Sequence, residues 1–180
     1  QQLLQKKSQP RKPRQAKQKK LPKNNLEVIS ILHNIRSLQN VGAMFRTADA
    51  AGITSLILTG YTPTPIDILG NVRKEFAKTA LGAERSVQWK SSKNISITII
   101  QLKKSGHHIY AIEEAKGAKD IFSYKITKPC AFIVGNEVTG LSRSVLAKCD
   151  AVLSIPMRGK KESLNVSVAF GIAAYAVKKS

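Results

Sequence analysis

Short apolar runs alternate along the chain with longer segments in which apolar residues recur at helical spacing. The runs predict buried strands, and the segments between them predict helices that cover a sheet. The expected strands are 26–32, 55–58, 109–112, 130–134 and 151–155, and the expected helices are 41–51, 72–81, 95–104, 141–148 and 164–177. This alternation is typical of an α/β domain with a mostly parallel sheet and helices on both faces. In such domains ligands bind at the carboxyl ends of the strands.

The first 23 residues have a different composition. They contain nine Lys or Arg residues, no Asp or Glu, and few apolar residues. We therefore expect residues 1–23 to be a disordered basic arm and residues 24–180 to form one domain. The whole chain carries a formal charge of +19, which indicates a polyanionic partner, with nucleic acid as the first candidate. A basic protein without such a partner is the alternative.

Several other classes of protein lack support in the sequence. No apolar run approaches the roughly 20 residues of a membrane helix, and the N-terminus lacks the apolar core of a signal peptide, so we expect a cytoplasmic protein with no membrane partner. Cys130 and Cys149 adjoin apolar runs and are expected to be buried free thiols. The three His and two Cys show no zinc spacing, so no metal is expected.

Polar clusters follow three of the expected strands, at the edge of the sheet where a ligand would bind. They are residues 33–40, which lead into a helix that carries Arg46, residues 133–142, which contain Glu137, and residues 155–169. Each cluster also has a purely structural explanation, as a helix cap, a loop carboxylate paired with a basic neighbour, or a solvated helix face. Because the clusters coincide at three strand ends, we favour a single functional site.

The third cluster predicts a helix start with unusual polarity. A strand-like run ends at Pro156, a loop rich in Gly and Lys follows, and Ser163 is expected to cap the next helix. Asn165 would then lie in the first turn of an otherwise apolar helix, which is costly unless that end faces a ligand or finds partners. In the first cluster we expect Asn40 to cap the helix and His33 to be solvated or structural, with substrate contact as the alternative for His33.

The three clusters resemble the motifs of the SpoU-type (TrmH-like) RNA 2′-O-ribose methyltransferases of the SPOUT superfamily. Residues 40–52 are similar to the first motif, residues 134–141 to the second and residues 155–169 to the third, and the likeness spans residues 26–178. The resemblance implies a deep trefoil knot near the C-terminus, a homodimer, and S-adenosylmethionine as the cofactor. It further implies methylation of a ribose 2′-hydroxyl in tRNA or rRNA.

The resemblance also implies roles for individual residues. The implied cofactor contacts are Gly135, Ile155, Met157 and Leu164, and the implied catalytic set is Asn40, Arg46, Glu137, Ser163 and Asn165. Arg46 is often cast as the base in this family, but a guanidinium with a pKa above about 12 is a poor proton acceptor. We therefore expect Arg46 to bind the phosphate beside the target ribose, and Glu137 to organise Arg46 or the opposing loop.

Two other functions stay open at this point. The first is a catalytically inactive RNA-binding or ribosome-assembly protein with the same fold, and the presence of the whole implied catalytic set speaks against it. The second is an α/β enzyme with a nucleotide cofactor, which is disfavoured because neither glycine-rich phosphate motif occurs. In each RNA-binding case, affinity would come from the basic arm and the dimer surface.

Overall fold

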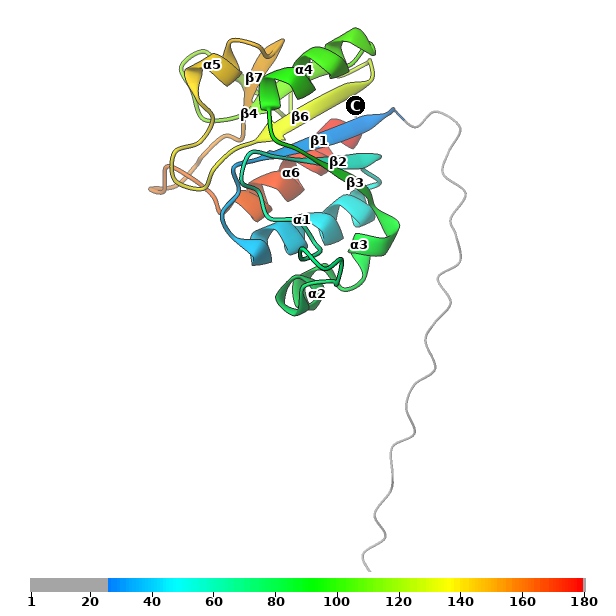
Figure 1. Ribbon diagram of the computed structural model, residues 1–180. Helices are drawn as coiled ribbons and strands as arrows, with labels where there is room; N and C mark the ends of the chain where they lie inside the picture. The colour runs from blue at the N-terminus through cyan, green and yellow to red at the C-terminus, as the bar shows by residue number, and fades with distance from the viewer. Residues whose placement is uncertain (1–25, 180) are drawn as a thin grey trace, which may run out of the picture.

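The described part of the chain is built around one seven-stranded sheet (Figure 1). This computed structural model describes residues 26–179, so the expected basic arm lies outside the described residues. The strands are β1 (Val28–His33), β2 (Ser55–Thr59), β3 (Gln88–Ser92), β4 (His108–Ile112), β5 (Lys119–Asp120), β6 (Cys130–Val134) and β7 (Ala151–Ser154). Their order is β3-β2-β1-β6-β4-β7-β5, and neighbouring strands are parallel. The expectation of a mostly parallel sheet is confirmed.

Helices cover both faces of the sheet, as the sequence predicts (Figure 1). One face packs against α1 (Leu38–Ala51), α2 (Lys74–Ala80), α3 (Ala83–Ser86) and α6 (Val166–Lys179), and the other against α4 (Ile95–Lys104) and α5 (Arg143–Leu146). Two apolar cores result, one on each face of the sheet. Phe45 and Phe170 belong to the first core, and Ile99 and Val145 belong to the second.

Strand β6 shows why an unbroken apolar run marks the centre of this sheet. All five of its residues are buried. Successive side chains of a strand point to opposite faces, so Phe132 joins the core under α1 and α6 while Ile133 joins the core under α4 and α5. A strand that is covered on both faces needs apolar residues at every position, and this is the pattern that predicts β6 from the sequence.

The elements that differ from the sequence-based expectation are short or exposed. Strand β3 has no buried residue and therefore no apolar pattern, while β5 has two residues and α3 has four. The helix expected over 141–148 is the four-residue α5, and the helix expected from residue 164 begins at Val166. Periodicity can be read only over several turns or over a buried strand, and β3, β5, α3 and α5 offer neither. The later start of α6 is a difference of two residues at the end of a helix that the sequence does predict.

Both cysteines are free as expected, but only one of them is fully buried. Cys130 and Cys149 are free thiols, the first buried and the second half-buried. Among the described residues, we find no helix with the length and apolar character that a membrane span requires. Residues 26–179 also contain no group of three or more His, Cys, Asp or Glu side chains placed to bind a metal ion.

Candidate functional site

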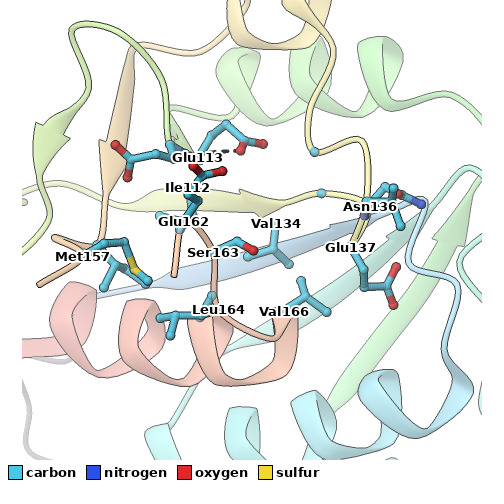
Figure 2. A pocket seen from close by; sticks show the side chains of 16 residues that line it. Ile112, Glu113, Val134, Asn136, Glu137, Met157, Glu162, Ser163, Leu164 and Val166 are labelled. Atoms are coloured by element: carbon cyan, nitrogen blue, oxygen red, sulfur yellow. Dashed lines mark hydrogen bonds between the residues drawn. The ribbon is translucent and has the colours of Figure 1, made fainter. Parts of the chain in front are cut away.

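A pocket of about 210 Å³ lies at the carboxyl ends of β4, β6 and β7 (Figure 2). Ile112 and Val134 are the last residues of β4 and β6, and the loops that follow these two strands, the loop before α6 and the first turns of α6 form the rest of the wall. The pocket therefore lies at the edge of the sheet where a parallel α/β fold binds ligands. Six of the residues implied by the resemblance line it: Gly135, Glu137, Ile155, Met157, Ser163 and Leu164.

The walls of the pocket combine apolar and acidic side chains. The apolar side chains include Ile112, Val134, Ile155, Leu164 and Val166, and the acidic ones other than Glu137 are Glu113, Glu114 and Glu162. Figure 2 shows Met157 at one end of the pocket and Glu137 with Asn136 at the other. Apolar walls suit a flat ring system, and carboxylates attract a cation. The pocket is thus suited to a ligand that is both aromatic and positively charged.

Gly135 is required by packing inside its own loop. A Cβ atom at this position would lie 2.8 Å from the carbonyl carbon of Gly140 and from the side chain of Leu141, which is closer than real contacts allow. An antiparallel bridge between Asn136 and Gly140 closes the loop, and Gly140 has a φ of +63°, in the left-handed region that favours glycine. This wall of the pocket is therefore the backbone of a tight turn.

Glu137 connects the loop after β6 to the start of α1. Its Oε2 accepts a hydrogen bond from the N–H of Arg36 at 3.0 Å. Its Oε1 accepts from the N–H of Ser37 at 3.2 Å and from the side-chain amide of Asn40 at 3.1 Å. Burial disfavours the charged carboxylate, but these bonds and one from its own N–H outweigh burial, so the pKa of Glu137 lies below its usual value. Glu137 thus organises the opposing loop, which is one of its two expected roles.

Asn165 joins the third cluster to the first. Its Nδ2 donates to Oδ1 of Asn40 at 3.4 Å. Its own Oδ1 accepts from the N–H and the hydroxyl of Ser167 at 2.9 and 2.7 Å, and its carbonyl accepts from the N–H of Ala169 at 2.9 Å. Asn165 is therefore the N-cap of α6. The three clusters meet through the series Glu137–Asn40–Asn165.

Both expected helix caps are wrong, and each error has the same origin. Ser37 caps α1, because its Oγ accepts from the N–H of Asn40 at 3.2 Å, and Asn40 lies in the first turn. Asn165 caps α6 in place of Ser163. Cap preference cannot choose between two cap-forming residues that stand a few positions apart. Asn165 is exposed and also finds partners at the helix start, so the cost expected for a buried polar residue there does not arise.

Arg46 lies outside the pocket of its own chain. It lines a second hollow of about 500 Å³ between α1, α2 and α6, together with Thr47, Lys78, Thr79 and Tyr175. Ammonium, guanidinium and hydroxyl groups are all donors that suit a phosphate group. Within one chain the structure therefore brings eight of the nine implied residues to one site, six in the pocket and two through the asparagine pair, and leaves Arg46 elsewhere.

Asn136 shapes the site, although the sequence analysis does not single it out. It is 8% exposed, and its side chain makes four hydrogen bonds. Nδ2 donates to the carbonyl of Asn34 at 3.0 Å and to the hydroxyl of Tyr61 at 2.8 Å. Oδ1 accepts from the N–H groups of Val138 and Thr139 at 2.8 and 2.9 Å. A polar residue in a glycine-flanked loop after a buried strand is the signal that points to it.

Glu113 is the second residue that sequence reasoning misses. Its Oε2 accepts from the N–H of Leu141 at 2.8 Å, and its Oε1 accepts from the N–H of Glu114 at 3.2 Å. It thereby ties the end of β4 to the loop after β6. Glu113 directly follows an expected strand, so the rule that sites lie at the carboxyl ends of strands would have found it.

His33 has a structural role, as expected. Its Nδ1 is hydrogen-bonded to Oγ1 of Thr59 at 2.9 Å, and its Nε2 to the amide of Asn34 at 3.2 Å. Burial lowers the pKa of His33 below its usual value, which favours the neutral ring at pH 7. Both ring nitrogens are occupied by neighbours within the fold.

Residues 27–175 match the family model described as the SpoU rRNA Methylase family. The chain is 34% identical over 151 residues to the 23S rRNA (guanosine-2′-O-)-methyltransferase RlmB of Haemophilus influenzae. The alignment covers 83% of this chain and 58% of that relative. The chain thus spans less than two thirds of the length of this curated relative.

Solved structures show the same relationship. The AdoMet-bound rRNA methyltransferase from Sinorhizobium meliloti is 27% identical with a TM-score of 0.77, over 86% of this chain and 57% of that one. A structure described as giving insights into the 2-OH methylation of C/U34 on tRNA is 26% identical with a TM-score of 0.72, over 84% of this chain and 94% of the other. Because the family match includes all three clusters and the pocket, this chain belongs to the SpoU rRNA methylase family.

Proposed function

We propose that this domain transfers a methyl group from S-adenosylmethionine to a ribose 2′-hydroxyl of tRNA or rRNA. The observation that carries this proposal is the series Glu137–Asn40–Asn165, which joins the three clusters beside the pocket. The relatives support it, because one has the name of a 23S rRNA guanosine 2′-O-methyltransferase and another is bound to AdoMet. The formal charge of +19 is consistent with RNA as the substrate.

The lining of the pocket fits S-adenosylmethionine. The side chains of Ile155 and Leu164 offer apolar contact to an adenine ring, and the backbone turn at Gly135 allows close approach. The acidic side chains of the pocket suit the positive sulfonium and amino groups. Met157 adds a flexible thioether that adapts to the shape of a ligand. When bound, the cofactor supplies the methyl group for transfer.

The residues beside the pocket supply alignment. Methyl transfer to a hydroxyl requires that the hydroxyl points at the methyl group and loses one proton. We assign Ser163 and Asn165 to orientation of the ribose hydroxyl, because the first lines the pocket and the second caps α6 beside it. The start of the 14-residue α6 also carries partial positive charge, which stabilises carboxylate or phosphate oxygens. Glu137 acts as a positioning residue by holding Asn40.

Arg46 is assigned to the RNA phosphate and not to proton removal. Its guanidinium stays charged, so the proton of the ribose hydroxyl leaves to a phosphate oxygen or to water. The hollow that Arg46 shares with Lys78 offers two cations for one phosphate. The developing alkoxide would be stabilised by the same guanidinium.

A homodimer would bring Arg46 to the pocket of a second chain. The side of α6 that faces away from the sheet carries exposed apolar residues, with Val168 51% and Tyr175 57% exposed and two helical turns apart. We propose that this face packs against a second copy and that each pocket uses Arg46 of the other copy. Val168→Asp should give a monomer by light scattering, with lower methyl transfer and retained cofactor affinity. A wild-type monomer with full activity would exclude the dimer.

We also propose that the C-terminal segment is knotted as a trefoil. The chain passes from β6 through α5 on one face to β7 beyond β4, and then crosses to α6 on the other face against α1. Such a return across the sheet is consistent with a C-terminal segment that threads through a loop of the same chain, which folded chains rarely show. Pulling both ends in an optical trap should give a contour length shorter than that of a fully extended chain. The full length would exclude a knot.

For an enzyme that acts on tRNA or rRNA, we retain the cytoplasm as the proposed location.

Transfer of labelled methyl groups to cellular RNA tests the proposed activity. The wild-type protein should label ribose 2′-hydroxyls, and Asn165→Ala should lower the rate roughly a hundredfold by removing an orienting group. Asn94→Ala is the matched control, because Asn94 caps α4 on the other face of the sheet and accepts from the N–H of Ile97 at 3.2 Å. Binding of RNA without transfer by the wild-type protein would instead favour the inactive RNA-binding or ribosome-assembly protein. Mapping 2′-O-methylation with and without the protein would identify the RNA.

A further inference from the structure

Tyr61 presents an exposed aromatic ring beside the pocket. It follows β2 at the same edge of the sheet where the pocket lies, and it is 60% exposed. Its hydroxyl accepts a hydrogen bond at 2.8 Å from Nδ2 of Asn136, which itself lines the pocket. One buried amide therefore connects the pocket to the ring, so the ring lies within reach of a nucleotide whose ribose enters the pocket.

Tyr61 is held both at its ring hydroxyl and at its backbone. In addition to the bond at its hydroxyl, its backbone N–H donates to Oδ1 of Asn34 at 3.3 Å. Asn34 has a φ of +57°, a left-handed conformation that Asn tolerates better than most residues. Gly60 has a φ of +66°, and a Cβ atom there would collide with the side chain of Asn34, so only glycine allows this close approach. An exposed aromatic side chain that is already fixed loses little entropy when it makes a contact.

We propose that Tyr61 is a stacking platform for a nucleobase of the RNA substrate, at or next to the nucleotide that is methylated. This inference rests on the proposed RNA methyltransferase activity and adds a contact to the base, which the pocket and the Arg46 hollow do not provide. Sequence-tolerant recognition of single-stranded RNA commonly combines aromatic rings that stack on bases with cations that bind phosphates. The exposed Arg36 supplies a nearby cation, since its N–H binds the same Glu137 that lines the pocket.

The chemistry of stacking predicts a contact that depends on the base and not on the phosphate. The test therefore compares a short single-stranded RNA with an abasic oligomer of the same length, for the wild-type protein and its variants. Loss of a base–aromatic stack should raise the Kd for the RNA by roughly 5- to 100-fold in Tyr61→Ala and in Tyr61→Leu. The Kd for the abasic oligomer should stay unchanged. Tyr61→Phe keeps the ring and should retain most of the preference for the RNA over the abasic oligomer.

Two controls separate stacking from a loss of structure. Phe122→Ala removes an aromatic residue of similar exposure, 63%, which follows β5 at the other end of the sheet, and it should change neither Kd. The affinity for S-adenosylmethionine, measured by calorimetry, should be the same in wild type, Tyr61→Ala and Tyr61→Leu, because Tyr61 does not line the pocket and Asn136 keeps its other three hydrogen bonds.

The outcomes also distinguish this inference from the proposed function. If the wild-type protein transfers methyl groups to RNA but Tyr61→Ala binds RNA and the abasic oligomer as the wild type does, the stacking role is excluded and the activity stands. Equal loss of affinity for both oligomers, or loss of cofactor affinity, would likewise overturn stacking in favour of a structural role. Failure of methyl transfer by the wild-type protein would overturn the proposed function itself.

Discussion

Replacing Glu137 by Ala removes the carboxylate that joins the loop after β6 to the start of α1. Three donors then lose their acceptor: the N–H groups of Arg36 and Ser37 and the side-chain amide of Asn40. The carboxylate is charged in the folded protein because these bonds outweigh the effect of burial and depress its pKa. The variant should therefore lose stability and also lose the orientation of Asn40 relative to Asn165.

The size of the effect follows from the number of bonds and the exposure of the site. Hydrogen bonds to a charged group contribute about 1.5–3 kcal/mol each when they are well shielded. The site is half-buried and the freed donors regain water, so we expect a loss of about 2–4 kcal/mol in the free energy of unfolding for all three together. Because the pKa of Glu137 is depressed in the folded protein, its contribution to the free energy of unfolding is present above pH 4.5 and is lost as the pH falls through the folded-state pKa. Displacement of Asn40 should lower kcat roughly a hundredfold.

Urea unfolding, calorimetric titration with S-adenosylmethionine and methyl transfer to RNA together test this reasoning for Glu137→Ala. Stability and kcat should fall while the cofactor affinity changes little. Glu162→Ala is the matched control, because Glu162 is an exposed acid that lines the same pocket, and its stability should change by less than about 0.5 kcal/mol. A Glu137→Ala protein of normal stability that has lost only cofactor affinity would refute the positioning role.

Three further changes have defined outcomes. Arg46→Lys keeps the charge but loses the planar fork, so methyl transfer should fall at least about tenfold with unchanged cofactor affinity, and full activity would exclude bidentate phosphate binding. Burial lowers the pKa of His33 below 6.5, so the unfolded chain binds more protons and stability should fall as the pH drops below 6.5. Urea unfolding at several pH values should show that the stability of His33→Asn depends less on pH than that of the wild type. The same pH dependence in both proteins would contradict this role of His33. Gly135→Ala would force a Cβ atom against Gly140 and Leu141, so it should cost about 1–3 kcal/mol of stability and weaken cofactor binding. If calorimetry shows that this variant binds the cofactor as tightly as the wild type does, the turn at Gly135 is not a wall of the cofactor pocket.

The sequence predicts the place of the site better than its contacts. Strands β4, β6 and β7 are visible as apolar runs, and a pocket at their carboxyl ends follows from the parallel arrangement. The helix caps are harder to predict, because Ser and Asn are equally good N-cap residues. Only the path of the backbone selects Ser37 in place of Asn40 as the cap of α1. Strand β3 escaped prediction because its pairing with β2 is made by backbone groups and leaves no apolar pattern.

The sequence by itself determined the α/β class, the two-faced burial of the central strands, the basic character of the chain and the edge of the sheet that carries the polar clusters. These properties depend on composition and on local periodicity, which a single segment already contains. Only the tertiary structure decided that Glu137 meets Asn40 across 97 positions and that Asn165 meets Asn40 across 125. It also decided that Arg46 lies apart from them. A hydrogen bond requires atoms placed within a few tenths of an ångström, and here strand order and helix packing, which no local pattern encodes, set that placement.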